Sequence, residues 1–90
     1  MSSFLVISSH TVEDCQMAID HFKDYHAGYL THFKWGCFDN DHNAYAIIDA
    51  DNHEAALLSV PPLLRDKARA IKVVTFNPRT KGDAVHPTGK

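Results

Sequence analysis

Residues 30–51, LTHFKWGCFDNDHNAYAIIDAD, decide the fold, because they read as two strands joined by a polar turn. The turn is predicted at residues 39–42, since short polar side chains hydrogen-bond their own backbone and tolerate left-handed conformations. A hairpin centred there places His32 opposite Asp49. Side chains alternate across a strand, so one face is apolar and the other is mixed. The apolar face holds Phe33, Trp35, Cys37, Ala44, Ala46, Ile48 and Ala50, and the mixed face holds His32, Lys34, Tyr45, Ile47 and Asp49.

The spacing of apolar residues predicts the elements on either side of the hairpin. Residues 4–7 form a continuous apolar run that is typical of a buried strand. Helical spacing extends over residues 12–26, and Gly28 is expected to end that helix. A second helix is predicted over residues 53–60, where a proline pair stops it. Residues 70–76 alternate as a last strand.

This order of elements, βαββαβ, predicts an α+β domain of the ferredoxin-like class. Right-handed crossovers then give an antiparallel sheet with strand order 4-1-3-2. Its helices can cover one face only, yet three strands carry apolar side chains on both faces. Large exposed apolar patches are rare on soluble monomers, so we expect a homodimer, or a multiple of dimers, that packs sheet to sheet. A tail that folds back would be the competing cover. The domain is expected to span residues 1–77, with residues 78–90 as a flexible or subunit-swapped tail.

The charge and composition of the chain argue against some classes of function. With a formal net charge of −2 and basic residues dispersed along the chain, there is no electrostatic footprint for nucleic acid or an anionic membrane. The sequence contains no run of about 18 apolar residues, so it predicts no membrane span, and no leader pattern is evident. Cys15 and Cys37 fall on predicted apolar faces, where free thiols pack as small hydrophobes. We therefore expect a cytoplasmic protein with no membrane and no nucleic-acid partner.

Residues 43–73, NAYAIIDADNHEAALLSVPPLLRDKARAIKV, resemble the muconolactone isomerase-like branch of the dimeric α/β-barrel superfamily. The resemblance lies in the strand that runs into Asp49, the Glu54-Ala55-Ala56-Leu57 helix opening and the Pro-Leu-Leu interruption. It implies a dimeric α/β barrel. The superfamily includes isomerases, cofactor-free monooxygenases, haem-degrading enzymes and small metal-binding proteins, but no catalytic motif of these matches here.

The first candidate site lies where the first two strands end and the third begins. This topology brings His10 near Cys37, Phe38, His42 and Tyr45. A histidine titrates near neutral pH and could act as a general base, with Tyr45 as a hydrogen-bond donor to a substrate oxygen. We therefore predict His10 and Tyr45 as catalytic residues. The alternative is that His10 only caps the next helix.

The second candidate site is the mixed face of the hairpin. There Asp49 could fix the tautomer of His32, and Lys34 could attract an anion. These three residues are the predicted substrate-binding set. The alternative interpretation is a cross-strand ion pair at a sheet edge.

Metal motifs are weak in this sequence, although it contains seven histidines. Residues 39–43 imitate the first half of a calcium loop but lack its glycine and its final glutamate. No C-x-x-C or H-x₃-H pair suggests zinc. A metal held by His10 and His42 stays possible, and no metal site and no cofactor are assigned.

Two classes of function follow. The first is a small-molecule isomerase or cofactor-free monooxygenase, and the second is a non-catalytic protein that binds a small ligand or a transition metal. Whether the protein is an enzyme stays open.

Overall fold

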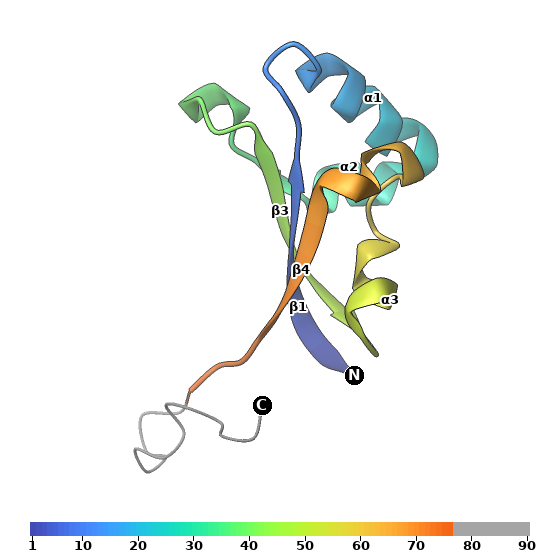
Figure 1. The fold of residues 1–90 in the computed structure, drawn as a ribbon, viewed down its shortest axis with the longest axis vertical. Helices are drawn as coiled ribbons and strands as arrows, with labels where there is room; N and C mark the ends of the chain where they lie inside the picture. Colours follow the sequence, from blue (N-terminus) through green and yellow to red (C-terminus); the bar gives the residue numbers. More distant parts are fainter. Residues whose placement is uncertain (77–90) are drawn as a thin grey trace.

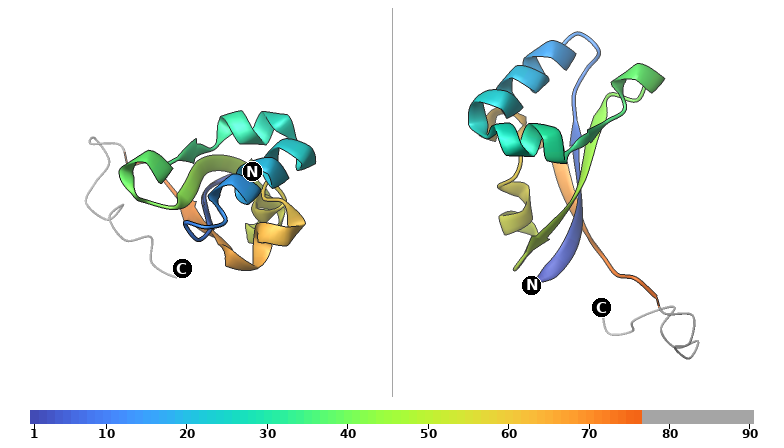
Figure 2. Two further views of the ribbon diagram at one scale, coloured as in Figure 1. Left: turned by 90° about the horizontal axis from the view of Figure 1, so that it is seen from above. Right: turned by 180° about the vertical axis from the view of Figure 1, so that it is seen from behind.

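The computed structural model describes residues 1–76 and contains a four-stranded antiparallel sheet with helices on one face (Figures 1 and 2). The sheet order is β2-β3-β1-β4, which confirms the predicted order 4-1-3-2 read from the opposite edge. The α+β class is likewise confirmed, whereas the predicted tail at 78–90 lies outside the described residues. The elements are β1 (Ser2–Ser9), α1 (Cys15–Tyr25), α2 (Ala27–His32), β2 (Lys34–Trp35), η1 (Cys37–Asp39), β3 (Asn43–Ala50), α3 (His53–Leu57), η2 (Pro62–Lys67) and β4 (Ala68–Val73).

The central strand β1 contributes alternate side chains to the buried core. Phe4, Val6 and Ser8 point under the helices and are at most 2% exposed. All eight residues of β1 pair with β3, and β4 pairs along its other edge. This double pairing satisfies the backbone N–H and C=O groups of β1 on both sides, as a strand in the middle of a sheet requires.

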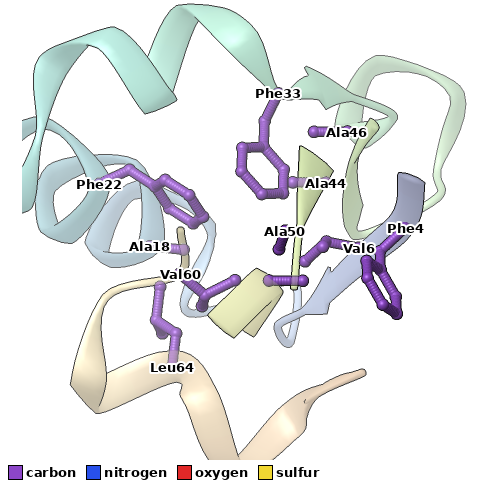
Figure 3. Packing of buried hydrophobic residues seen from close by; sticks show 11 residues of the cluster. Phe4, Val6, Ala18, Phe22, Phe33, Ala44, Ala46, Ala50, Val60 and Leu64 are labelled. Atoms are coloured by element: carbon purple, nitrogen blue, oxygen red, sulfur yellow. The ribbon is translucent and has the colours of Figure 1, made fainter. Parts of the chain in front are cut away.

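Helix α1 covers the sheet through a small aromatic cluster. The ring of Phe22, which is fully buried, lies 4.9 Å from that of Phe33 and 5.1 Å from that of Trp35, both in edge-to-face geometry. Figure 3 shows Phe22 and Phe33 facing each other between the helices and the sheet. Buried aromatic pairs of this kind add to the stability that area burial provides. The cluster therefore fixes α1 against the start of the hairpin.

The end of the first helix differs from the prediction. Tyr25 is its last residue, and His26 adopts an extended backbone (φ −166°, ψ 105°). Gly28, which was expected to end the helix, lies inside the next one, α2. The cause is local: the His26 imidazole accepts a hydrogen bond from the Gly28 backbone N–H and so caps α2. The segment before β2 is therefore helical and not extended.

The hairpin register also differs from the prediction. Lys34 pairs with Tyr45 and Trp35 with Ala44, two residues away from the expected partners. The loop is longer than predicted because the Gly36 carbonyl accepts hydrogen bonds from the Asp39 and Asp41 N–H groups, which places Cys37 and Phe38 in a 3₁₀ turn instead of the strand. A shift of two residues preserves the face of each side chain. The predicted faces are therefore correct for the residues of β2 and β3, although the predicted pairs are wrong, and His32 and Cys37 lie outside the strands.

The second half of the domain follows the prediction closely. Helix α3 begins at His53, as expected, and the Asn52 side chain accepts a hydrogen bond from the Ala55 N–H as its cap. The helix ends at Leu57, three residues before the predicted end at residue 60, and a 3₁₀ helix, η2, begins at Pro62. Strand β4 runs from Ala68 to Val73, so it begins two residues and ends three residues earlier than predicted.

The outer face of the sheet is apolar in its middle. The cross-strand row Ile47, Leu5 and Ile71 runs over three neighbouring strands, with Ile47 52% and Ile71 38% exposed. Polar residues flank this row, including Asp49 at one end of the sheet and Arg69 at the other. Among residues 1–76, no helix is long and apolar enough to cross a membrane.

Candidate metal centre

Four histidine and cysteine side chains, of types that can ligate a metal, meet at one end of the sheet, where β1 ends and β3 begins. His10 follows β1, Cys15 opens α1, Cys37 opens η1 and His42 precedes β3. Figure 1 shows the β1–α1 connection and η1 at the same end of the molecule. A backbone hydrogen bond from the His10 N–H to the His42 carbonyl (3.1 Å) joins the two segments directly. The sheet register therefore determines that these residues are neighbours.

Local turns aim the two cysteines at this point. The Thr11 hydroxyl accepts a hydrogen bond from the Asp14 N–H (3.2 Å), which forms a turn that delays the start of α1 until Cys15. On the other side, the Gly36 carbonyl accepts from the Asp39 and Asp41 N–H groups. A Cβ atom at Gly36 would lie 2.7 Å from the Asp41 carbonyl oxygen, so this close turn requires glycine.

The donor atoms are as close together as a metal site needs. One atom from each of the four side chains lies within 4.8 Å of the others. The Cys15 and Cys37 sulfurs are 3.1 Å apart, and the Cys37 sulfur lies 3.4 Å from His10 Nε2. A tetrahedral zinc site with Zn–S of about 2.3 Å and Zn–N of about 2.0–2.1 Å has ligand–ligand distances of about 3.3–3.8 Å. The observed separations bracket this range.

The chemistry of the cluster also suits a cation. His42 Nδ1 is buried and has no hydrogen-bond partner among residues 1–76, which is costly for a polar atom unless something binds it. Burial, and then the nearby His42, lower the pKa of the His10 imidazole and favour the neutral form that coordinates metals. Burial, followed by the contact with Cys15, raises the pKa of the Cys37 thiol. A metal ion would therefore displace a proton there.

Sequence reasoning anticipated part of this cluster. The convergence of His10, Cys37 and His42 was predicted from topology and is confirmed. Cys15 was missed, since it was taken as a residue packed inside a helix, and both cysteines are half-buried with their sulfurs in contact. The available signal was a mirrored spacing, H-x₄-C at 10–15 and C-x₄-H at 37–42.

Tyr45 does not belong to the cluster. Its hydroxyl donates a 2.5 Å hydrogen bond to Asp41 Oδ2 and accepts one from Asn43 Nδ2. Asn43 Nδ2 also donates to the other oxygen of Asp41. The phenol therefore already has an acceptor in the loop, in contrast to the free donor that the predicted catalytic role needs.

The hydrogen bond to Asp41, and then desolvation, raise the pKa of Tyr45. A raised pKa means that folding favours the neutral phenol, so the stabilisation is complete below about pH 10 and is lost as the pH rises through the folded pKa. We expect Tyr45 to contribute a late step to a phenolate absorbance titration, one that Tyr45→Phe removes. A variant with an unchanged high-pH step would contradict this assignment.

The second predicted site is rearranged. His32 Nε2 lies 3.0 Å from the Ile47 carbonyl, and Asp49 accepts from the Ser3 hydroxyl at 2.7 Å. The two side chains share an open depression of ≈ 370 Å³, but His32 does not take the predicted cross-strand position opposite Asp49, because it is the last residue of α2. Lys34 and Tyr45 line an adjoining, mainly apolar depression of ≈ 350 Å³ on the outer face. His10 lines a different cavity, of ≈ 200 Å³.

Comparison with known proteins finds no match to this chain among protein-family models, curated proteins or solved structures. The resemblance to muconolactone isomerase-like proteins thus stays a prediction. The inference of function depends on the geometry of the cluster.

Proposed function

We propose that this protein binds one transition metal ion per chain, of the zinc class, through His10, Cys15, Cys37 and His42. The observation that carries the proposal is that all four donor atoms lie within 4.8 Å of one another. Thiolate and imidazole donors suit zinc and related borderline or soft ions, whereas magnesium and calcium prefer oxygen ligands. Zinc is therefore the first metal to test.

The number of donors favours a non-catalytic role for the metal. A catalytic zinc site keeps a coordination position open for water or substrate, whereas four protein ligands close the tetrahedral shell. The four residues come from the β1–α1 connection, α1, η1 and the segment before β3. A bound ion would therefore fasten parts of the chain that are distant in sequence, which benefits a domain with a small core.

The isomerase or monooxygenase function has weaker support. Its proposed donor, Tyr45, is hydrogen-bonded to Asp41, and His10 belongs to the sulfur-containing cluster. His32, Lys34 and Asp49 line open depressions on the sheet. Substrate binding by these three residues stays an untested prediction.

The test is a titration of reduced, metal-free protein with Zn²⁺ against a chromophoric chelator, followed by native mass spectrometry. We expect one zinc per chain. Co²⁺ should bind in the same place and give the intense visible bands of tetrahedral coordination together with thiolate charge-transfer absorption. The matched control is His21→Gln, because His21 lies in α1 and is not one of the four donors. Failure of the wild-type protein to retain zinc or cobalt would overturn the proposal.

We further propose that two copies pair through the outer faces of their sheets. Supporting this, the row Ile47, Leu5 and Ile71 forms an apolar centre with charged residues beyond it. In a two-fold interface the same patch meets itself, so an apolar centre with a polar rim is self-complementary.

The substitution Ile47→Lys places a charge in the middle of this face. We expect it to convert a dimeric protein into a monomer without loss of fold, because Ile47 is half-exposed in the single chain. Native mass spectrometry and circular dichroism give the two readouts. Glu54→Lys, at an exposed position of α3, is the control for added charge. A monomeric wild-type protein would rule this pairing out.

A further inference from the structure

We propose that the metal centre is gated by oxidation: a two-electron oxidant joins Cys15 and Cys37 in a disulfide, and the metal ion leaves. This inference rests on the proposed metal-binding function for its consequence, the release of the ion. The formation of the disulfide itself depends only on the thiol pair.

The geometry of the thiol pair carries the proposal. The two sulfurs already lie 3.1 Å apart, whereas a disulfide bond is about 2.05 Å long. Closing the pair therefore requires a relative movement of about 1 Å. Cys15 is the first residue of α1 and Cys37 the first of η1, so each thiol stands at the end of an element and next to a loop.

The surroundings hold the pair in place while leaving it accessible. The ring of Phe22 packs on Phe33 and Trp35, which ties α1 to the segment that leads into Cys37. Both cysteines are only partly buried, so a small oxidant can reach the sulfurs. Oxidation within one chain is thus favoured over cross-linking between chains, because the partner sulfur is already in contact.

The two cysteine sulfurs can either ligate the metal ion or form the disulfide, but they cannot do both at once. A zinc ion needs the thiolate lone pairs, and disulfide sulfurs are poor ligands for it. After oxidation only His10 and His42 would remain as donors. Two imidazoles on their own form an incomplete shell, so the ion exchanges into solvent.

The reaction balances with a peroxide as the oxidant. One thiolate attacks the peroxide O–O bond, which gives a sulfenic acid and, with one proton, a water molecule. The second thiolate attacks the sulfenic sulfur, which forms the S–S bond and, with a second proton, releases another water molecule. The two sulfurs lose two electrons, the peroxide gains two, and zinc leaves as Zn²⁺ without a change in oxidation state. A thiol reductant reverses the oxidation and regenerates both ligands.

The experiment uses the full chain, first reduced and loaded with one equivalent of Zn²⁺, then freed of reductant and titrated with hydrogen peroxide. A chromogenic chelator reports released zinc, and intact mass with peptide mapping reports the bond. We expect one zinc released per disulfide, a Cys15–Cys37 link within one chain, and recovery of zinc binding after addition of dithiothreitol. Metal-free reduced protein should form the same link, and Cys15→Ser should form none.

The outcomes separate the two proposals. Reduced protein that takes up no zinc would overturn the proposed function before any oxidant is added. Reduced protein that takes up zinc and keeps it after the disulfide has formed would overturn the gating. Oxidation that yields cross-linked chains or sulfinic acids in place of the Cys15–Cys37 bond would also overturn the gating, while the metal-binding function would stand.

Discussion

Replacing Cys37 by serine is expected to weaken zinc binding roughly 100- to 1,000-fold. Structural zinc binding contributes about 10–16 kcal/mol at neutral pH, which, divided among four donors, is about 2.5–4 kcal/mol for each. The hydroxyl of serine is not ionised at neutral pH and cannot replace the thiolate. Cys37 is suited to this test because its sulfur contacts both Cys15 and His10.

The measurement is a competition titration with a chelator whose zinc affinity is known, on wild-type protein and Cys37→Ser. His42→Ala should show a loss of zinc affinity of similar size, because a donor atom of His42 lies within 4.8 Å of those of the other three residues. His21→Gln should bind as the wild-type protein does. If Cys37→Ser and His42→Ala both kept wild-type affinity, the zinc would be held elsewhere.

Zinc is expected to stabilise the folded domain by about 4 kcal/mol when its free concentration is 1,000 times the dissociation constant. A domain of this size shifts its melting temperature by about 4–8 °C for each kcal/mol, so the shift should be roughly 15–30 °C. The physical reason is that the donors exist as a set only in the folded chain, where the His10–His42 backbone hydrogen bond brings the two segments together.

Thermal and urea unfolding with zinc, with a strong chelator and with Mg²⁺ give the comparison. We expect zinc alone to stabilise wild-type protein, and the effect to disappear in Cys37→Ser. Identical unfolding midpoints in zinc and in chelator would argue against a site that joins the β1–α1 connection to η1.

The fold of this chain could be predicted from its sequence because an error of two residues in strand register does not change which face a side chain lies on. The predicted hairpin was wrong in register by two residues, yet the side chains that remain in β2 and β3 kept their faces, since the period of a strand is two. The strand order followed from connectivity rules alone. The start of the second helix at His53 was predictable too, whereas its end at Leu57 falls three residues before the end that the proline pair predicted.

The site was only partly predictable because it depends on where elements begin and end. His10 and His42 could be placed together from the topology, and a backbone hydrogen bond joins them. Cys15 depends on a turn made by Thr11, which delays the helix by three residues relative to the predicted start. Cys37 depends on the loop around Gly36, which takes it out of the strand. Boundaries of this kind arise from single hydrogen bonds and are not visible in apolar periodicity.

The predicted pairing of His32 with Asp49 was lost for the same reason. His26 caps a short helix over 27–32, so His32 ends a helix instead of lying within a strand. Its imidazole contacts the Ile47 carbonyl, and Asp49 takes the Ser3 hydroxyl. A local cap can thus move a predicted site without any change in the fold.

X-ray absorption at the zinc edge, recorded on the reduced protein loaded with one equivalent of Zn²⁺, tests the metal centre most directly. We predict four ligands: two sulfurs at about 2.3 Å and two imidazole nitrogens at about 2.0–2.1 Å. A first shell made only of oxygen and nitrogen would contradict the proposal, because Cys15 and Cys37 would then take no part in binding.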